Sequence, residues 1–285
     1  MSEIKKIEIE LLEKLTKDKK NAAATLKQQE ARYLVDSYYQ VQGFRIASGN
    51  QIRALDKENK KLNKPHEPHE VLSFFNAQFR VIEDEIKSTL DVYVSSRPIG
   101  RWLMSITGIG PVIAAGLIAH IDIKKCQTAG AIWRYAGLDP SVKWEKKQKR
   151  PWNAQLKTLC WKIGQSFCKV SRSPKDVYGR IYHQRKVYEE EKNEGGEYAE
   201  YAKKMLEDFN FKKDTKARKF YMEGKLPPGH INQRALRYAV KLFLSHLFQV
   251  WYEMENGEKP PKPFAIAQLG HAHMIEPPNW PMVEE

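Results

Sequence analysis

Apolar residues recur at intervals of three and four over most of the chain, which predicts helices rather than strands. The clearest case is residues 69–94, where seven apolar positions form a seam and the charged residues lie off it: Leu72, Phe75, Phe79, Ile82, Ile86, Leu90 and Tyr93. Residues 1–57 follow a weaker pattern of the same period, and the proline-containing segment 63–69 separates the two stretches, so we expect a long N-terminal helical hairpin. The seam either packs inside the chain or forms a coiled coil that makes a homodimer or higher oligomer through residues 72–93.

The remaining pattern predicts a mainly α fold in three segments. The first is the helical hairpin or coiled coil, the second a central domain with short helices and glycine turns, and the third a helical C-terminal region with an extended, proline-rich tail. These segments are 1–100, 101–172 and 173–285. The helices expected after the central turns cover residues 153–169, 174–224 with an interruption at Gly195-Gly196, and 231–253; residues 227–229 form a loop, and the tail packs through Phe264, Leu269 and Trp280.

The positive charge of the chain is concentrated in one stretch. The 285 residues carry a formal charge of +13, and thirteen basic residues between Lys143 and Lys186 face only two acidic ones. Such a stretch favours a polyanionic partner, for which DNA is the expectation and RNA the alternative. The three cysteines form no C-x-x-C pair, the first twenty residues are too charged for a signal peptide, and the apolar run 109–121 is too short to span a bilayer. We therefore expect a cytoplasmic protein with no membrane partner, no bound metal and no cofactor.

Residues 103–119 resemble a helix-hairpin-helix, in which a Gly108-Ile109-Gly110 turn precedes a helix that starts at Pro111. Glycines allow a positive φ and close approach of a ligand, and Pro is favoured at the first helical position. The free amides of that helix N-terminus would hold a phosphate oxygen, so we predict backbone contacts at Thr107, Gly108, Ile109 and Gly110. The alternative is a tight turn in a core without a ligand.

Aromatic residues alternate with cations in the basic stretch. Trp144 and Trp152 lie in its loop, where stacking on bases or sugars and core packing are equally good interpretations. Trp161 lies on the following helix, and we predict that it packs in the core. The expected nucleic-acid contacts in this stretch are Lys143, Trp144, Lys146, Lys147, Lys149, Arg150, Trp152, Asn153 and Lys157. Arg234, Arg237 and Lys241 form a basic stripe that is either a second backbone-contact surface or a solvated helix face.

Two motifs carry a family resemblance. Residues 106–121, around Thr107-Gly-Ile-Gly-Pro111, and residues 128–140, ending in Ala136-Gly-Leu-Asp-Pro140, resemble the C-terminal domain of the DEDD insertion-sequence transposases, the bridge-RNA-guided recombinases. Asn153 with Leu156-Lys157 is similar to the start of that family's basic helix, and the seam is similar to its coiled coil. The resemblance implies a prokaryotic or phage-encoded DNA-binding protein of transposition and recombination.

The sequence also departs from that family. Its members carry an N-terminal RNase-H-like domain with four metal-binding acids, and the helical pattern here predicts no such domain. Nothing in the sequence arranges the acids Asp36, Glu70, Asp91, Asp122 and Asp139 as a two-metal site, so Mg²⁺ is expected only if a partner supplies a nuclease centre. Ser141 is the only serine in the loop where the family has its nucleophile, and a turn role is the alternative to a catalytic one. Two histidine pairs, His66 with His69 and His271 with His273, lack a third metal ligand at fixed spacing.

Three hypotheses follow. The first is a transposase-family DNA-binding protein that grips the backbone through the hairpin and the basic stretch, without its own nuclease centre. The second is an active transposase or recombinase that works with a partner nuclease or through a serine such as Ser141. The third is a coiled-coil structural or interaction protein of a mobile element or phage.

Overall fold

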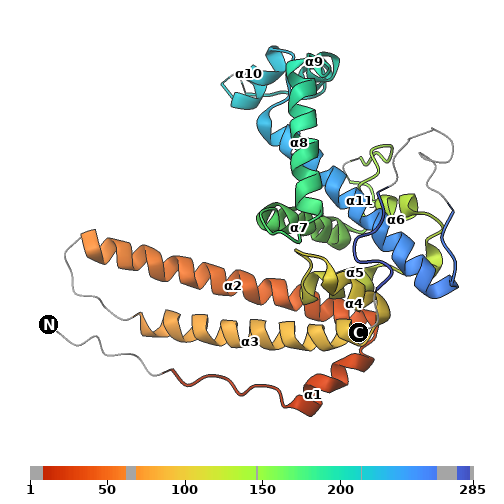
Figure 1. Ribbon diagram of the computed structural model, residues 1–285. Coiled ribbons are helices and arrows are strands. Elements are labelled where there is room, and N and C mark those ends of the chain that lie inside the picture. Colours follow the sequence, from red (N-terminus) through yellow and green to blue (C-terminus); the bar gives the residue numbers. More distant parts are fainter. Residues whose placement is uncertain (1–8, 62–68, 146, 213, 262–274, 283–285) are drawn as a thin grey trace. The chain divides into compact units, whose positions relative to one another are not determined.

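The structure is a computed structural model that describes residues 9–61, 69–145, 147–212, 214–261 and 275–282. These residues form eleven α-helices and two short 3-10 helices, and they contain no strand, so the predicted mainly α class is confirmed (Figure 1). The helices are α1 (Lys17–Asn21), η1 (Ala22–Thr25), α2 (Gln28–Lys61), α3 (Glu70–Ser95), α4 (Pro98–Ser105), α5 (Pro111–His120), η2 (Ile123–Lys125), α6 (Ala129–Tyr135), α7 (Ala154–Val170), α8 (Tyr178–Glu194), α9 (Ala199–Asp208), α10 (Lys216–Met222) and α11 (Pro228–Asn256). None of the helices in the described part of the chain is long and apolar enough to cross a membrane.

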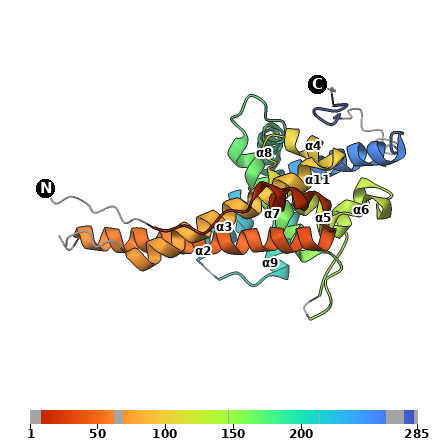
Figure 2. The same cartoon turned by 90° about the horizontal axis from the view of Figure 1, so that it is seen from below.

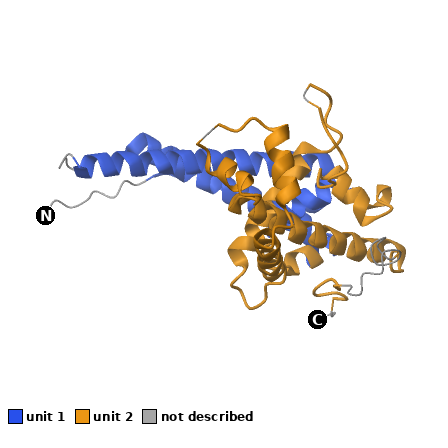
Figure 3. Cartoon of the chain, turned by 90° about the horizontal axis from the view of Figure 1, so that it is seen from above, with its two compact units in different colours: residues 1–101, 110–121 blue, residues 102–109, 122–285 orange. Residues whose placement is uncertain are grey.

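The chain divides into two compact units. Unit 1 comprises residues 1–101 and 110–121, and unit 2 comprises residues 102–109 and 122–285 (Figure 3). The three segments delimited from the sequence do not coincide with these units and stay predictions.

Unit 1 is built on the antiparallel pair α2 and α3, which lie side by side in Figures 1 and 2. The carboxylate of Glu83 on α3 joins the two helices because it accepts hydrogen bonds from Gln42 Nε2 at 2.9 Å and from the Arg45 guanidinium on α2. Burial raises the pKa of Glu83, but the hydrogen bonds from Arg45 and Gln42 outweigh burial and leave that pKa lowered. The predicted helical hairpin is therefore present, held by packing and by a partly buried charge cluster.

The apolar seam of α3 is buried at its C-terminal end and exposed at its N-terminal end. At its C-terminal end Leu90 and Tyr93 are fully buried in unit 1, so this part packs inside the chain. At its N-terminal end Phe75 is 49 % exposed and stacks on Phe79 at 6.2 Å between ring centroids, and Phe79 lies 5.6 Å from the exposed Phe44 of α2. Self-association through this seam stays a prediction, and its accessible part is the N-terminal end.

The prediction that residues 1–57 form continuous helix is wrong for the described residues 9–16. This segment is not helical and runs along α3, where Gln78 accepts a hydrogen bond from Leu12 N at 2.8 Å and donates one to Glu10 O at 2.6 Å. Leu15 N also donates to Glu85 Oε2 at 3.0 Å. Side chains of α3 thus satisfy three backbone groups of this segment, which would otherwise need helical partners.

Unit 2 is centred on α11, which packs on α6, α7 and α8. Four large aromatic residues are fully buried there: Trp102, Phe167, Tyr178 and Phe243. The ring of Phe243 lies 6.3 Å from Trp102, 5.4 Å from Phe167 and 5.3 Å from Tyr178, which makes it the centre of this core. A smaller cluster of Ala202, Tyr221, Leu226 and Ile231 holds α9 and α10 together with the start of α11.

Two helix boundaries in unit 2 refine the prediction. Gly196 has a φ of +80° and follows the end of α8, so the predicted interruption at this glycine pair is confirmed. Residues 228 and 229, in contrast, are the first turn of α11 rather than loop, because Pro228 occupies the first helical position, where no amide hydrogen is needed.

The described C-terminal segment 275–282 has no helix, turns at Pro278-Asn279, and is hydrogen-bonded to the rest of unit 2. Trp102 Nε1 donates to Pro278 O at 2.9 Å, and Trp280 Nε1 donates to Glu253 Oε2 at 2.7 Å. The predicted packing of the tail through Trp280 is therefore confirmed. The other two predicted anchors of the tail, Phe264 and Leu269, lie outside the described residues.

A buried histidine completes this attachment. His246 Nε2 lies 2.8 Å from Ile275 O and its Nδ1 lies 2.8 Å from the hydroxyl of Tyr178. Burial lowers the pKa of His246 to about 4, so the imidazole is neutral at physiological pH. In the tautomer that satisfies both contacts, Nε2–H donates to the carbonyl and Nδ1 accepts from the tyrosine hydroxyl.

Candidate nucleic-acid interface

The predicted hairpin turn belongs to unit 2 up to Ile109. Gly108 has a φ of +97°, and a Cβ at this position would lie 3.2 Å from the Phe167 ring, so glycine is required. Ser166 Oγ donates to Gly108 O at 2.6 Å, and Thr107 Oγ1 donates to Lys175 O at 3.3 Å. Ile109 is buried as a whole residue, so the turn offers little of it to a ligand.

Gly110 belongs to unit 1 and is the N-cap of α5. It has extended backbone with φ −107° and ψ 177°, provides no side-chain cap, and has open space where a Cβ would lie. The other end of α5 is capped: Arg32 Nε donates to Ala119 O at 2.7 Å, and Gln28 Nε2 donates to Ile118 O at 3.4 Å. The first amides of α5 thus have no side-chain acceptor at the N-cap, while a cation complements the helix dipole at its C-terminus.

The loop between α6 and α7 concentrates cations. Lys143, Lys147, Lys149 and Arg150 are exposed, and none of them forms an ion pair within the part of the chain that the structure describes. Lys146, which was also predicted to bind nucleic acid, lies outside the described residues. These unpaired charges leave the loop strongly positive.

Trp144 and Trp152 pack together inside this loop. Their ring centroids are 6.4 Å apart at an interplanar angle of 65°, and Trp144 Nε1 donates to Gln148 O at 2.8 Å. The Arg150 guanidinium lies 5.2 Å from the Trp144 ring, and Lys157 Nζ lies 4.2 Å from the Trp152 ring. Trp152 therefore packs within the loop. Trp144 is 38 % exposed, and its stacking on a base or sugar stays a prediction.

Asn153 fixes the start of α7. Its Oδ1 accepts from Leu156 N at 2.9 Å as a helix N-cap, and its Nδ2 donates to the hydroxyl of Tyr135 on α6 at 3.0 Å. Gly137, between these helices, has a φ of +65°, and a Cβ there would lie 2.7 Å from Trp152 Cγ. Because Gly137 has no side chain, the Trp152 ring can pack directly on the backbone of the Ala-Gly-Leu turn.

Trp161 corrects a prediction. It was expected in the core, but it is 55 % exposed on α7. The buried stripe of this helix comprises Leu156, Leu159, Cys160, Ile163, Gly164 and Phe167. Position 161 is two residues from Ile163, which at 100° per residue places it on the opposite face. The helical period would have identified Trp161 as a surface residue, and it was missed because it was grouped with the apolar Leu159 and Ile163, two residues before and after it.

The three residues of the predicted stripe on α11 have different surroundings. Arg234 Nε lies 2.6 Å from Glu189 Oε2, a fully buried carboxylate on α8 that also accepts from Arg185 and from the hydroxyl of Tyr198. Arg234 is therefore engaged within the protein. Lys241 Nζ lies 4.1 Å from the Trp133 ring. Arg237 is exposed and forms no ion pair within the described residues, so it is the freest of the three cations.

Repulsion from neighbouring cations helps to lower the pKa of two of these lysines. The pKa of Lys157 is lowered by burial and by the positive charges of Arg237 and Arg150. The pKa of Lys241 is likewise lowered by burial and by Arg237, although Asp139 opposes this shift. Cations from the loop, α7 and α11 of unit 2 therefore share one electrostatic environment, which a bound anion would stabilise.

Ser141, the candidate nucleophile, lies in an exposed turn before the loop. Its hydroxyl donates to Asp139 Oδ1 at 2.7 Å and its amide donates to the same oxygen at 2.9 Å. These hydrogen bonds lower the pKa of Asp139, as do the nearby charges of Arg134 and Lys241. The geometry is that of an Asx turn, which accounts for the serine without a catalytic role.

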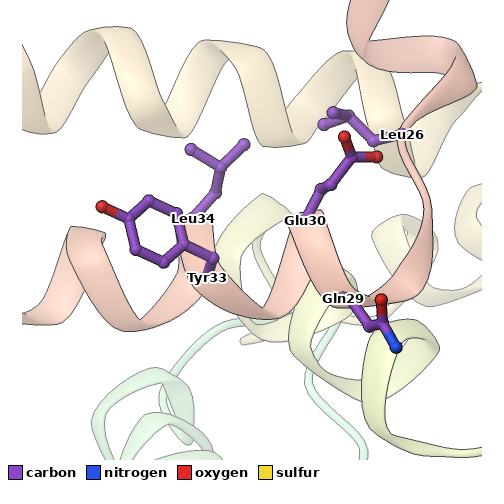
Figure 4. A pocket seen from close by; sticks show the side chains of 5 residues that line it. All are labelled: Leu26, Gln29, Glu30, Tyr33 and Leu34. Carbon is purple, nitrogen blue, oxygen red and sulfur yellow. The ribbon is translucent and has the colours of Figure 1, made fainter.

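No group of three metal-ligating side chains occurs among the described residues. Of the four histidines considered from the sequence, only His69 is described, and its Nε2 lies 3.6 Å from Asp56 Oδ1. A hollow at the start of α2 is lined by Leu26, Gln29, Glu30, Tyr33 and Leu34 (Figure 4). It belongs to unit 1 and contains none of the residues predicted to bind nucleic acid.

The comparisons with known proteins point to the same part of the chain. No curated protein and no solved structure matches the chain. The family model described as "Transposase IS116/IS110/IS902 family" matches residues 100–176, which include the hairpin, α5, α6, the basic loop and α7. Over these residues the chain resembles that transposase family, and the match supports a transposase-related function.

Proposed function

We propose that the chain is a transposase-related protein that binds nucleic acid by its phosphate backbone. The observation that carries this proposal is the loop between α6 and α7, whose exposed cations have no acidic partner among the described residues. Cations at a protein surface are normally interspersed with acids, and an unpaired group favours a polyanion. The loop lies within the residues that match the transposase family.

Three features favour an ordered binding surface over a loop that is only solvated. The paired rings of Trp144 and Trp152 give the loop an apolar base, and the Asn153 cap attaches it to the start of α7. Burial and the positive charges of Arg237 and Arg150 lower the pKa of Lys157 on α7, so cations repel one another in the free protein. Bound phosphates would neutralise that repulsion, so part of the binding free energy would come from its removal.

The N-terminus of α5, which belongs to unit 1, is a separate phosphate contact in this proposal and is argued independently of the loop of unit 2. Among the described residues no side-chain cap bonds the amides of this N-terminus, and Gly110 leaves room for close approach. Backbone amides at a helix N-terminus bind phosphate oxygens and are indifferent to base sequence. The proposed role is therefore to hold and orient nucleic acid, with sequence choice left to other parts of a transposition system.

Salt dependence tests the proposal. If about five phosphates are engaged, the slope of log K against log salt on duplex DNA is about −4 to −5. Replacing Lys143, Lys149 and Arg150 by Gln should reduce the magnitude of that slope by about 0.9 for each lost contact. A matched control replaces three exposed lysines of α9 and α10 by Gln, which removes the same charge elsewhere in unit 2: Lys203, Lys204 and Lys216.

The loop variant and the control separate a local contact from net charge. The proposal expects the slope to change in the loop variant and to stay close to the wild type in the control. A flat slope for the wild type, or equal changes in both variants, would refute binding through this loop. Circular dichroism of both variants verifies that the helices are intact.

A further inference from the structure

Exposed aromatic side chains gather around the basic loop of unit 2. Trp161 is 55 % exposed on α7, Trp144 is 38 % exposed in the loop, and Tyr135 at the end of α6 is 42 % exposed. Leaving large rings in water forgoes about 25 cal/mol for each Å² that could be buried. A single exposed ring needs no explanation, but a group of them marks a contact surface.

A further ring and a cation belong to the same surface. Lys157 lies against the ring of Trp152, 4.2 Å from its centroid, and Trp152 contacts Trp144 at 6.4 Å. On α7, Lys157 and Trp161 are four residues apart and therefore share a helix face. Three rings and a cation thus make up this surface, and we call Trp144, Trp152, Lys157 and Trp161 the tryptophan surface.

The ring of Trp144 is also held in position. Its Nε1–H donates to Gln148 O at 2.8 Å, and the Arg150 guanidinium lies 5.2 Å from its centroid. A ring that is fixed before binding loses little conformational entropy when a planar ligand stacks on it. Arg150 supplies the charge for the phosphate that accompanies such a ligand.

We propose that the tryptophan surface stacks unpaired bases, so that the nucleic acid bound by this loop is single-stranded or has unpaired nucleotides. This inference rests on the proposed function. Phosphate contacts alone use cations and amides, and in a continuous duplex the faces of the bases are covered by their neighbours, so the exposed rings would have no ligand. Rings together with cations are the arrangement by which proteins bind single strands without reading their sequence.

Fluorescence anisotropy with the full chain tests this inference. The probes are a labelled single-stranded DNA 20-mer, the RNA of the same sequence, and the DNA 20-mer in a duplex. The single strands should bind more tightly than the duplex at equal salt. Trp161→Ala should weaken single-strand binding about 10-fold, within the range for loss of one stacked base, and should change duplex binding less than twofold. Trp161→Phe should retain most of the affinity.

Phe209→Ala is the matched control, because Phe209 is also 55 % exposed in unit 2 but lies after α9, outside the tryptophan surface. If the duplex binds with the expected salt slope, but single strands bind no better and Trp161→Ala has no effect, stacking is refuted while the proposed function stands. If no probe binds in a salt-dependent way, both are refuted. The tighter of the two single strands identifies DNA or RNA as the source of the bases.

Discussion

The N-terminus of α5 gives the sharpest prediction, because one substitution should change stability and binding in opposite directions. Gly110 has extended backbone and open space around its Cβ position, so an aspartate fits there without strain. Asp is a better N-cap than Gly by a few tenths of a kcal/mol, and a negative charge beside a helix N-terminus adds about 0.3–1 kcal/mol. Gly110→Asp should therefore raise the free energy of unfolding by about 0.5–1.5 kcal/mol.

The same aspartate would occupy the amides that the proposal assigns to a phosphate. Loss of a charge-assisted hydrogen bond costs about 1.5–3 kcal/mol, so duplex affinity should fall at least about 10-fold. Urea denaturation followed by circular dichroism measures the first effect, and anisotropy at fixed salt measures the second.

Gly229→Asp is the control for this experiment. Gly229 lies in the first turn of α11, also with open space at its Cβ position, and is outside the proposed interface. It should stabilise the protein through the helix dipole and leave binding unchanged apart from the small effect of one charge. If Gly110→Asp binds as tightly as the wild type, or if both variants lose affinity equally, the proposed phosphate contact at α5 is wrong.

Three further predictions concern the body of the protein. Glu189→Gln should lower the free energy of unfolding by about 3 kcal/mol, because it leaves Arg185 and Arg234 without their buried counter-ion; a change below about 0.5 kcal/mol in urea denaturation would contradict this. Gly137→Ala should cost at least about 1–2 kcal/mol in backbone strain and move the Trp152 ring, seen as a lower melting temperature with altered tryptophan fluorescence; a melting temperature equal to that of the wild type would argue against that strain. Stability should fall as pH drops from about 6.5 to about 4, since the unfolded chain protonates His246 first; His246→Gln should flatten that fall, and a variant with the wild-type profile would rule the group out.

Local patterns predicted the helices well where one face of the helix is buried. The seam of α3 was predicted from its spacing because burial repeats every three to four residues along it. The segment 9–16 was mispredicted because its hydrogen-bond partners on α3 are 66 and 70 residues away in sequence, for Leu12 and Leu15 respectively. The start of α11 was missed because proline and glycine were taken as helix breakers, although proline is favoured at the first position.

The candidate interface was likewise predicted from the sequence only in part. The cations of the loop could be predicted from composition, since charge density is a property of the sequence itself. Whether a cation is free depends on tertiary pairing: Arg234 binds Glu189, which is 45 residues away, and no local pattern indicates this pair. Asn153 is a helix cap, a role that a residue preceding a helix commonly has, and its predicted nucleic-acid contact stays a prediction.

The division of the chain into units constrains how the gene can be cut or exchanged. Unit 1 is not one continuous stretch, because α5 returns to it after residues 102–109, which belong to unit 2. A gene fragment ending at residue 101 would lack α5 and leave the faces of α2 and α3 that it covers open to water, so we expect that fragment to aggregate. Homologous exchange with a related gene meets the same obstacle, since a junction inside residues 102–121 would mix parents in both hydrophobic cores at once. A junction just before residue 102 mixes parents in unit 1 alone, and a junction just after residue 121 mixes parents in unit 2 alone, so a single junction always divides at least one core.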